Sequence, residues 1–578
     1  MEAIKVIDPR ADVSEDMIRN HIILQGGRLV SQNVINADGS YENSVPQSVN
    51  FTINPPSTTT ILDRRVMVKY QVKISLTTNG DLQDPFEDGK GLGFNGLRQF
   101  PMSSIIDTTT VQINGESISD NTADILHPML NYGVYYDAQT SYNSTSPLMN
   151  DNYQNYEDWV GAGPSNGSAK NPLAAWGANA VIDTRASFGY VSSNRSTGSA
   201  KIWELVYDIT EPLFLSPFSS GFSTKLEQGF VNINQMTINL RYKSDLGYIW
   251  STTPYRSANG GGFELDAVVT NVAVIFTKTP TLLVTYISPD ITQPIPPIQV
   301  LNYSKPLVFK KTLDPFPGGK DTRITNTSDS IKLSQIPRKM FLWCAVDPKD
   351  AIGQLTTGPV TSGRAPWCTT DTFPSLANVN VQWANQTSLL ATATKEQLYD
   401  MCVMNGLKRS YTQWKDYVGS VYCVEFGTQI GLLDSEAPGC VSQAQIQVTS
   451  TWVNLQTNTN LPQRKYTFYM MFLLEGTCSI TENSARALLG NFTPADVLNA
   501  KKQPQSMTME YSDYNGGGQF FTNLKNFFKK LGGVSHKILS GPIGQGLKVA
   551  FPEASPFIMG ADKIAQMASG SGRRGRLR

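Results

Sequence analysis

The sequence has little histidine, and its cysteines are confined to one half. Only three histidines occur among the 578 residues, at positions 21, 127 and 536. All six cysteines lie from Cys344 onward, and none forms a Cys-x-x-Cys pair. A jelly-roll metalloenzyme needs histidine and carboxylate ligands clustered on facing strands, so this class is excluded. A disulfide framework is excluded too, because the first half has no cysteine. We therefore expect no metal and no cofactor.

Familiar catalytic motifs are also missing. A Ser-His-Asp triad would have to recruit His127, and no Gly-x-Ser-x-Gly elbow is present. The segment GKGLGFNG at Gly89–Gly96 lacks the Gly-Lys-Ser/Thr ending of a phosphate-binding loop. Asp158 and Asp416 stand in matching aromatic surroundings, and we interpret both as turn or capping residues. The sequence therefore predicts no catalytic residue and no enzyme.

Charge is sparse and unevenly distributed, and long apolar runs are absent. Charged residues make up 17% of the chain, below the usual quarter. No run of 18 apolar residues predicts a membrane-spanning helix. The start, MEAIKVIDPR, has neither the basic nor the apolar region of a signal peptide, so we expect synthesis inside the cell without secretion. Residues 519–578 carry ten Lys/Arg against two acidic residues, a net +8 that the remaining residues balance with −8.

One segment of the sequence occurs twice. Val111–Gly133 reads VQINGESISDNTADILHPMLNYG, and Val381–Gly406 reads VQWANQTSLLATATKEQLYDMCVMNG. Each begins as a short alternating strand, passes through a polar turn and continues into a helix, which Thr394 and Gln397 start with a capping box in the second copy. Three flanking blocks keep the same order: Leu62–Met67 with Ile336–Phe341, Tyr156–Gly161 with Trp414–Gly419, and Val206–Thr210 with Val424–Thr428. We interpret this as an internal duplication of a unit of roughly 200 to 270 residues.

Strand patterns indicate the fold of this unit. Val66–Leu76 alternates apolar and polar residues, as a strand with one buried and one wet face does. Arg338–Val346 holds the matching position but is apolar on both sides, which predicts a more buried strand. Many short strands, 46 glycines and 33 prolines favour an all-β protein. We predict two tandem jelly-roll sandwiches (a double jelly roll) with short helices in loops and a basic amphipathic C-terminal tail.

The expected organisation has five parts. They are an N-terminal arm at 1–48, a first jelly roll with long surface loops at 49–288, a second jelly roll at 289–485, a short helix and Gly-rich hinge at 486–518, and the basic tail at 519–578. The short helix is predicted over Ala485–Leu498. The Asn/Ser/Gly-rich stretch 141–200 is expected on the outer surface, since long loops commonly carry surface contacts.

The tail contains the candidate binding residues. An apolar helical stripe is the candidate membrane contact: Phe520, Phe521, Leu524, Phe527, Phe528 and Leu531. Bordering lysines and a terminal arginine cluster are candidate nucleic-acid contacts: Lys525, Lys529, Lys530, Arg573, Arg574, Arg576 and Arg578. The alternative is an ordinary amphipathic helix docked on the protein's own underside.

The duplicated strand–helix–strand order of Val111–Gly133 and Val381–Gly406 resembles viral major capsid proteins of the double jelly-roll type. This group of DNA virus proteins includes the adenovirus hexon and the major capsid proteins of virophages, polinton-like viruses and adintoviruses. The resemblance covers about residues 50 to 485 and implies upright jelly rolls, two per chain, in homotrimeric pseudo-hexagonal capsomers of an icosahedral virion. The basic tail departs from the pattern of most such capsomers.

The resemblance also implies partners. These are other copies of the chain, neighbouring capsomers, other capsid proteins such as a penton, and the viral genome or an internal membrane through the tail. A host receptor is not specified. Two alternatives stay open: a single jelly-roll capsid protein similar to those of parvoviruses, and a two-domain carbohydrate-binding or adhesive β-sandwich protein.

Overall fold

The structure is a computed structural model of the whole chain, in which two compact units, Met1–Gln503 and Pro504–Arg578, are distinguished. The described residues are 29–44, 46–79, 95–97, 100–133, 189–197, 200–218, 229–244, 246–252, 256–257, 263–264, 269–288, 295–319, 321–346, 374–384, 386–407, 409–412, 414–415, 420–455, 465–490 and 492–502. The tail and its candidate contact residues, the Gly-rich hinge, the block Tyr156–Gly161 and most of the 141–200 stretch lie outside these ranges.

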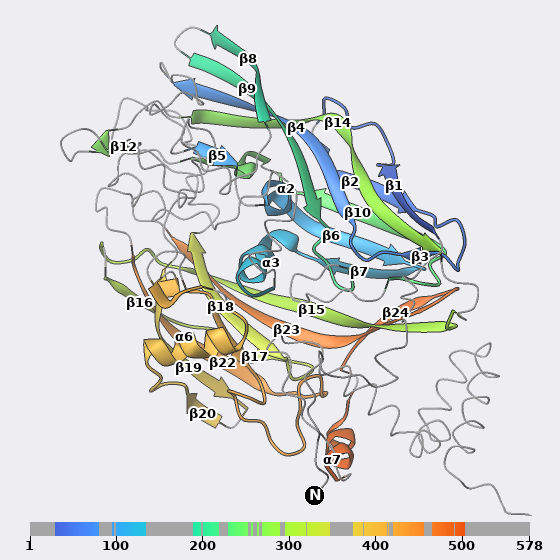
Figure 1. The fold of residues 1–578 in the computed structure, drawn as a ribbon. Helices are drawn as coiled ribbons and strands as arrows, with labels where there is room; N and C mark the ends of the chain where they lie inside the picture. The colour runs from blue at the N-terminus through green and yellow to red at the C-terminus, as the bar shows by residue number, and fades with distance from the viewer. Residues whose placement is uncertain are drawn as a thin grey trace, which may run out of the picture. The chain divides into compact units, whose positions relative to one another are not determined.

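Two facing sheets form the first sandwich (Figure 1). One sheet has the order β1-β14-β4-β9-β8, with β3 beside β14, and the other has the order β2-β10-β6-β7. The strands are β1 Leu29–Asn36, β2 Ser48–Ile53, β3 Ile61–Leu62, β4 Met67–Asn79, β6 Ile106–Ile113, β7 Glu116–Asp120, β8 Gly189–Thr197, β9 Ala200–Pro212, β10 Met236–Tyr242 and β14 Val269–Ser288. Two small ribbons add β5 Asn95–Leu97 with β11 Trp250–Thr252, and β12 Arg256–Ser257 with β13 Phe263–Glu264.

The second sandwich also has two sheets. Their orders are β15-β23-β18-β21, with β24 beside β23, and β16-β22-β19-β20, with β17 beside β22. The strands are β15 Ile298–Leu313, β16 Arg323–Thr327, β17 Ile331–Lys332, β18 Lys339–Val346, β19 Ser375–Trp383, β20 Gln386–Leu389, β21 Tyr422–Glu425, β22 Gln445–Val453, β23 Tyr466–Thr481 and β24 Ala485–Leu489.

Both sandwiches share one topology. Numbering the eight principal strands of each in chain order gives β1, β2, β4, β6, β7, β9, β10 and β14 in the first, and β15, β16, β18, β19, β20, β21, β22 and β23 in the second. In both, one sheet then runs first–eighth–third–sixth and the other second–seventh–fourth–fifth. A jelly roll consists of eight strands that are divided in this order between two packed antiparallel sheets. The prediction of two tandem jelly rolls is therefore confirmed.

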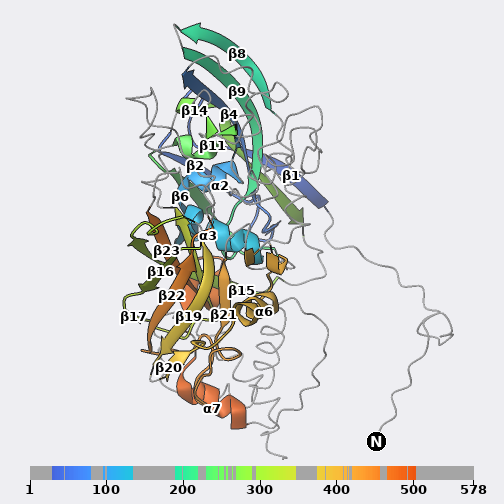
Figure 2. The same cartoon turned by 90° about the vertical axis from the view of Figure 1, so that its left-hand side faces the viewer.

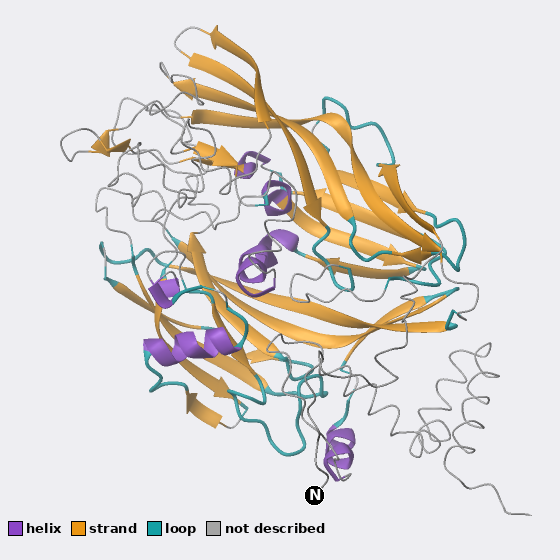
Figure 3. Cartoon of the chain, in the orientation of Figure 1, coloured by secondary structure: helices purple, strands orange, loops and turns teal. Residues whose placement is uncertain are grey.

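Short helices sit in the connections (Figure 3). They are α2 Pro101–Ile105, α3 Thr122–Pro128 continued by the π-helical turn η2 Met129–Gly133, the 3-10 turn η4 Leu246–Ile249, α6 Lys395–Met404 and α7 Pro494–Lys502. α3 and α6 follow the fifth strand of their respective jelly rolls, as the duplicated segments require. The predicted capping box of α6 is present, with Thr394 accepting from the Gln397 amide and Gln397 accepting from the Thr394 amide.

The expected difference between the two third strands is confirmed. In β4 the alternate residues Val68, Tyr70, Val72, Ile74 and Leu76 are buried, while the residues between them are half-buried or exposed. In β18 every residue from Met340 to Cys344 is buried. A strand that is buried on both faces has a second layer of protein over its outer side.

The predicted N-terminal arm at 1–48 is wrong for part of its length. Residues 29–36 form β1, which pairs with β14 along its whole length from Leu29 opposite Ser288 to Asn36 opposite Thr281. The apolar side chains Val30 and Val34 point outward, so the sequence shows no buried apolar face here. Main-chain pairing with β14 holds most of this strand, and Ile35 near its end packs against the first core.

The helix predicted over Ala485–Leu498 is wrong in its first part. Residues 485–489 form β24 because β23 offers a free edge at Gly476–Ile480. A Cβ atom at Gly476 would lie 1.9 Å from the main-chain oxygen of Leu488, so only glycine permits this pairing. Gly490, with φ of +68°, then ends the strand, and α7 begins at Pro494.

Candidate functional site: the junction of the two jelly rolls

The most extensive described site is the junction, where α3 of the first jelly roll covers the outer face of a second-roll sheet. Ile125 of α3 is buried in one apolar cluster with second-roll residues of β18, β23 and the segment at β21: Phe341, Trp343, Val421, Cys423, Tyr469, Met471 and Leu473. These alternate along their strands with inward residues such as Leu342 and Met470, which belong to the second roll's own core. The junction therefore explains why β18 is apolar on both sides.

Tyr132 in η2 anchors the same contact. Its hydroxyl donates to the Val421 carbonyl at 2.5 Å, and its ring meets the Phe341 ring edge-on, with centroids 5.2 Å apart. Burial, followed by the nearby Cys402 and Cys423 thiols, raises the pKa of Tyr132 well above its usual range. The side chain thus stays a neutral donor, which suits a buried contact between two domains.

Two ion pairs border the apolar cluster. Lys310 of β15 reaches Asp124 of α3 at 2.6 Å, and its ammonium also lies 5.8 Å from the centre of the Tyr469 ring. Lys305 of β15 lies 2.9 Å from Asp120 and also donates to the Ser119 carbonyl. Burial raises the pKa of Asp120 to about 6, although Lys305 acts in the opposite direction. Both pairs join a lysine of β15 to an acid of the first roll, which is Asp124 in α3 and Asp120 at the end of β7.

A hairpin turn extends the junction at its other end. Asn114 and Gly115 join β6 to β7 with φ of 42° and 93°, as an Asn-Gly turn of this kind requires. The Asn114 amide nitrogen donates to the carbonyls of Asn232 and Thr481, each at 2.7 Å. One carbonyl lies in each jelly roll, so this single side chain holds the two together.

The first core also extends into the second roll's longest strands. β15 and β23 are each 16 residues long. Leu301, Tyr303, Cys478 and Ile480, near one end of this pair, belong to the core cluster of the first jelly roll. The other ends hold the second core, with Phe468 and Phe472 among its members. The paired strands β15 and β23 therefore contribute side chains to the cores of both domains.

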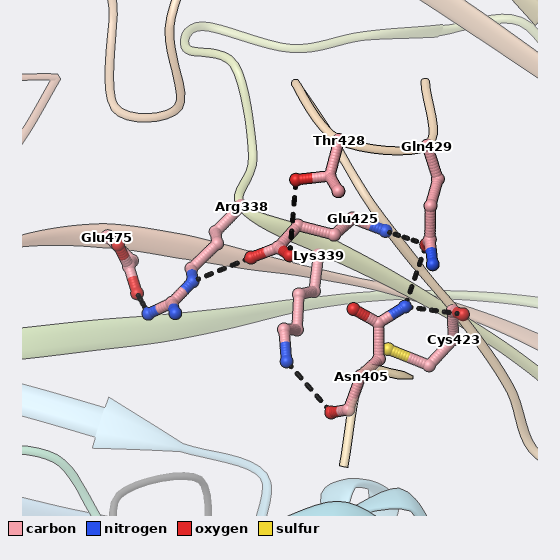
Figure 4. A network of polar contacts seen from close by, with 8 residues as sticks. All are labelled: Arg338, Lys339, Asn405, Cys423, Glu425, Thr428, Gln429 and Glu475. Carbon is pink, nitrogen blue, oxygen red and sulfur yellow. Dashed lines mark hydrogen bonds and ion pairs between the residues drawn. The ribbon is translucent and has the colours of Figure 1, made fainter. Parts of the chain in front are cut away.

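A polar network reinforces the second roll beside the junction (Figure 4). Arg338, just before β18, donates to Glu425 of β21 at 3.2 Å and to Glu475 of β23 at 2.6 Å. The Asn405 side chain at the end of α6 donates to the Cys423 carbonyl at 3.0 Å, and Lys339 donates to the Asn405 carbonyl at 3.0 Å. A cation at a helix C-terminus is favourable. The network fixes α6, which packs beside β21 (Figure 2).

A buried carboxyl group lies in the first roll, next to α2. Glu211 of β9 accepts from the main-chain amides of Met102 at 3.0 Å and Ser103 at 2.7 Å, and from the Ser103 hydroxyl at 2.6 Å. Burial raises its pKa to about 7, with these donors opposing the shift. The arrangement ties β9 to α2.

Sequence reasoning did not identify the junction residues, and its own candidates all lie in the tail outside the described ranges. The one usable sign was the strand at Arg338–Val346, apolar on both sides. Within the described ranges, no group of three or more His, Cys, Asp or Glu is arranged to hold a metal ion. The same ranges contain no helix that is long and apolar enough to cross a membrane.

Comparisons with known proteins agree with this architecture. Residues 2–285 match the family model of the Sputnik virophage major capsid protein first domain, and residues 317–418 match that of the major capsid protein V20 C-terminal domain. The capsid protein V20 of Sputnik virophage is 27% identical over 564 residues, covering 93% of this chain and 88% of that protein.

Solved structures support the same fold. The cryo-EM structure of the Sputnik virophage matches with a TM-score of 0.73 at 24% identity, covering 88% of this chain and 97% of the matched chain. The mavirus major capsid protein matches with a TM-score of 0.59 at 12% identity, covering 88% and 99% of the two chains.

Two tandem jelly rolls joined through α3 and a shared pair of strands define a double jelly-roll capsid protein. The chain is a major capsid protein of the virophage type, and proteins of this kind are structural components of the viral shell. The alternative of a single jelly roll is wrong, because the full strand set occurs twice. The carbohydrate-binding or adhesive alternative is not supported by any of these matches. Homologous capsid proteins assemble with themselves and are part of the virion.

Proposed function

We propose that three copies of the chain close into a pseudo-hexagonal capsomer, which builds an icosahedral shell. The observation that carries this proposal is the combination of identical strand order in both rolls with a junction between unlike surfaces. The helix side of the first roll packs on a sheet face of the second. A head-to-tail contact of this kind forms a ring when its rotation closes. With two rolls per chain, a six-membered ring contains three chains.

The two surfaces that would continue the ring are both exposed. On the second roll, the outward side of α6 presents Glu396, Asp400, Val403 and Met404, and Met404 is 71% exposed. On the first roll, the outer face of the sheet containing β1 presents Val30 and Val34, 57% and 64% exposed. Lys69 lies on the same face, in β4. Acidic and apolar groups on the helix thus match lysine and apolar groups on the sheet, as at the internal junction.

Sizing of matched variants tests this arrangement. Met404→Asp and Val34→Asp each place a charge in the proposed contact, so we expect trimers to give way to monomers in analytical ultracentrifugation. Met404→Leu keeps the apolar volume and should leave the trimer intact. A stable wild-type monomer at micromolar concentration, or trimers formed by both Asp variants, would contradict the proposal.

For the tail we propose a position inside the particle, where its two halves contact different partners. Six large apolar side chains at Phe520–Leu531 could each contribute roughly 1.5–3 kcal/mol on burial, enough to hold a helix at a lipid surface. Each lysine beside them adds about 1 kcal/mol near anionic headgroups. The arginines at 573–578 have no apolar partner face and suit phosphate backbones, with an affinity that falls as salt rises.

A 515–578 peptide tests both halves of the tail. We expect liposome leakage that is lost in the Phe527→Asp/Phe528→Asp double variant, and nucleic-acid binding that weakens between 50 and 200 mM salt. Leakage that persists in the double variant, or binding indifferent to salt, would instead favour a helix docked on the protein's own underside.

The remaining roles follow from the same proposal. The chain is synthesised in the host cell, resides in the virion, and contacts neighbouring capsomers and a penton-type protein. It has no catalytic role. The 141–200 stretch faces outward on the capsomer. We propose 288/289 as the boundary between the two jelly-roll domains, and the gap between the strands that end at Ser288 and begin at Ile298 supports it.

A further inference from the structure

The outer face of the sheet β2-β10-β6-β7 carries rows of uncharged polar side chains. Cross-strand pairing sets them in register, and buried residues such as Phe51 and Val111 alternate with them on the inner side. One row runs Thr52–Thr237–Gln112–Ser117, and the next runs Asn50–Asn239–Thr110–Ser119. Asn239 donates its side-chain amide to Asn50 within the second row. We call this surface the first neutral face.

The equivalent sheet of the second jelly roll, β16-β22-β19-β20, repeats the pattern. Its rows are Thr325–Thr451–Asn378, Thr327–Thr449–Asn380 and Gln447–Gln382. The hydroxyls of Thr325 and Thr451 lie 3.0 Å apart, as do those of Thr327 and Thr449. This surface is the second neutral face. Both halves of the chain place Thr, Asn and Gln on this face.

The sheet on the other side of the first sandwich is different. Its outer face carries charges, among them Lys69 and Lys73 of β4 and Glu204 of β9, with Lys73 and Glu204 paired at 3.5 Å. On the neutral faces, the charged side chains stand at the borders. These are Asp38, which accepts from Thr52 at 2.7 Å, with Asp107 and Arg241 on the first, and Lys311, Arg323 and Lys332 on the second. In the first roll, the neutrality therefore belongs to one of the two sheets.

We propose that the two neutral faces are the surfaces through which this chain contacts other copies of itself in neighbouring capsomers. The inference rests on the proposed trimeric capsomer and adds the lateral contact. Charged residues are depleted at the cores of protein interfaces, because burying an ion costs more than its pairing returns. Hydroxyl and amide groups pair with the same groups on another copy without that penalty. The first neutral face is also continuous with the junction, since Lys305 donates to the carbonyl of Ser119 at its edge.

The size of each face favours contact between capsomers over contact within one. Four strands spaced about 4.8 Å apart, with two or three rows about 6.8 Å apart, give a face of roughly 260–390 Å². A stable pair needs about 800 Å² per partner, so a single face supports weak association only. Two faces per chain make six per trimer, and several weak contacts add in a shell. Six also matches the number of neighbours around a capsomer in a hexagonal array.

Isosteric substitutions in the full-length protein provide the test. Thr449→Glu and Thr237→Glu each place one charge in the middle of a neutral face. Thr449→Gln and Thr237→Gln introduce a side chain of the same shape as glutamate but without its charge. We expect both Glu variants to sediment as trimers, to melt near the wild-type temperature, and to lower particle yield at least tenfold in negative-stain microscopy. Both Gln variants should assemble as the wild type does.

Several results would overturn the inference. Glu variants that assemble normally would show that these faces do not meet other copies. Gln variants that fail as badly as Glu variants would show that neutrality is not the relevant property. Glu variants that fall apart into monomers would place the faces inside the capsomer instead. A wild-type protein that never forms trimers is a separate outcome, because it refutes the proposed capsomer and with it the lateral contact.

Discussion

Truncating Ile125 to alanine tests whether the junction couples the two jelly rolls. Ile125 is 4% exposed and lies in the cluster with Phe341, Trp343 and Val421. The change removes three carbon atoms, worth about 2.4 kcal/mol in transfer alone at ~0.8 kcal/mol each. The cavity left behind raises the expected cost to roughly 3–4 kcal/mol, within the range measured for such core truncations.

The cost should fall on the docking of the two domains, because Ile125 contributes to neither sandwich core. We expect Ile125→Ala to lower the urea midpoint and to separate the unfolding of the two jelly rolls into distinct transitions. Leu398→Ala is the matched control, since Leu398 is 0% exposed within the second core. That variant should destabilise the second roll without uncoupling the first. A loss below about 1 kcal/mol in Ile125→Ala, with cooperativity unchanged, would refute the role of the junction.

Three further changes have defined outcomes. Asn114→Asp leaves the carbonyls of Asn232 and Thr481 without their donor and sets a carboxylate beside them, so calorimetry should show a loss of roughly 2–3 kcal/mol. Arg338→Met strips the partner from two largely buried carboxylates and should cost roughly 3 kcal/mol in urea unfolding, whereas a neutral result would mean the network is dispensable. Glu211 has its pKa raised from 4.5 to about 7, so it stabilises the fold below pH 4.5 and loses that contribution as pH rises to 7. That interval corresponds to roughly 3 kcal/mol, and Glu211→Gln should flatten this part of the pH–stability curve; an unchanged curve would contradict the assignment.

Local patterns in the sequence were enough to predict the fold class. The alternation in Val66–Leu76 predicts that its apolar residues are buried on one face of a strand. In the structure these residues of β4 are buried, as predicted. The helix start at Thr394 is encoded by residues three positions apart, so no distant partner is needed. The repeat of Val111–Gly133 at Val381–Gly406 predicted two units of one topology, which the strand orders confirm.

Elements held by distant partners were missed. The outward apolar residues of β1 give no helical or strand pattern, and its pairing with β14 joins residues about 250 positions apart. β24 forms because β23 runs beyond its own sandwich and leaves an edge next to Gly476. In both places the stabilising groups belong to the main chain of another segment, and a local pattern carries no record of them.

By itself, the sequence determined that the chain is all-β, duplicated and without catalytic motifs, because periodicity and residue type encode burial and chemistry locally. Its one sign of the junction was an apolar outer side on the strand at Arg338–Val346, with no indication of what covers it. Only the tertiary structure decided that α3, more than 200 residues earlier, supplies that cover through Ile125 and Tyr132. Likewise, it alone brought Thr and Asn residues of separate strands into neutral rows, since register is set by pairing across the sheet.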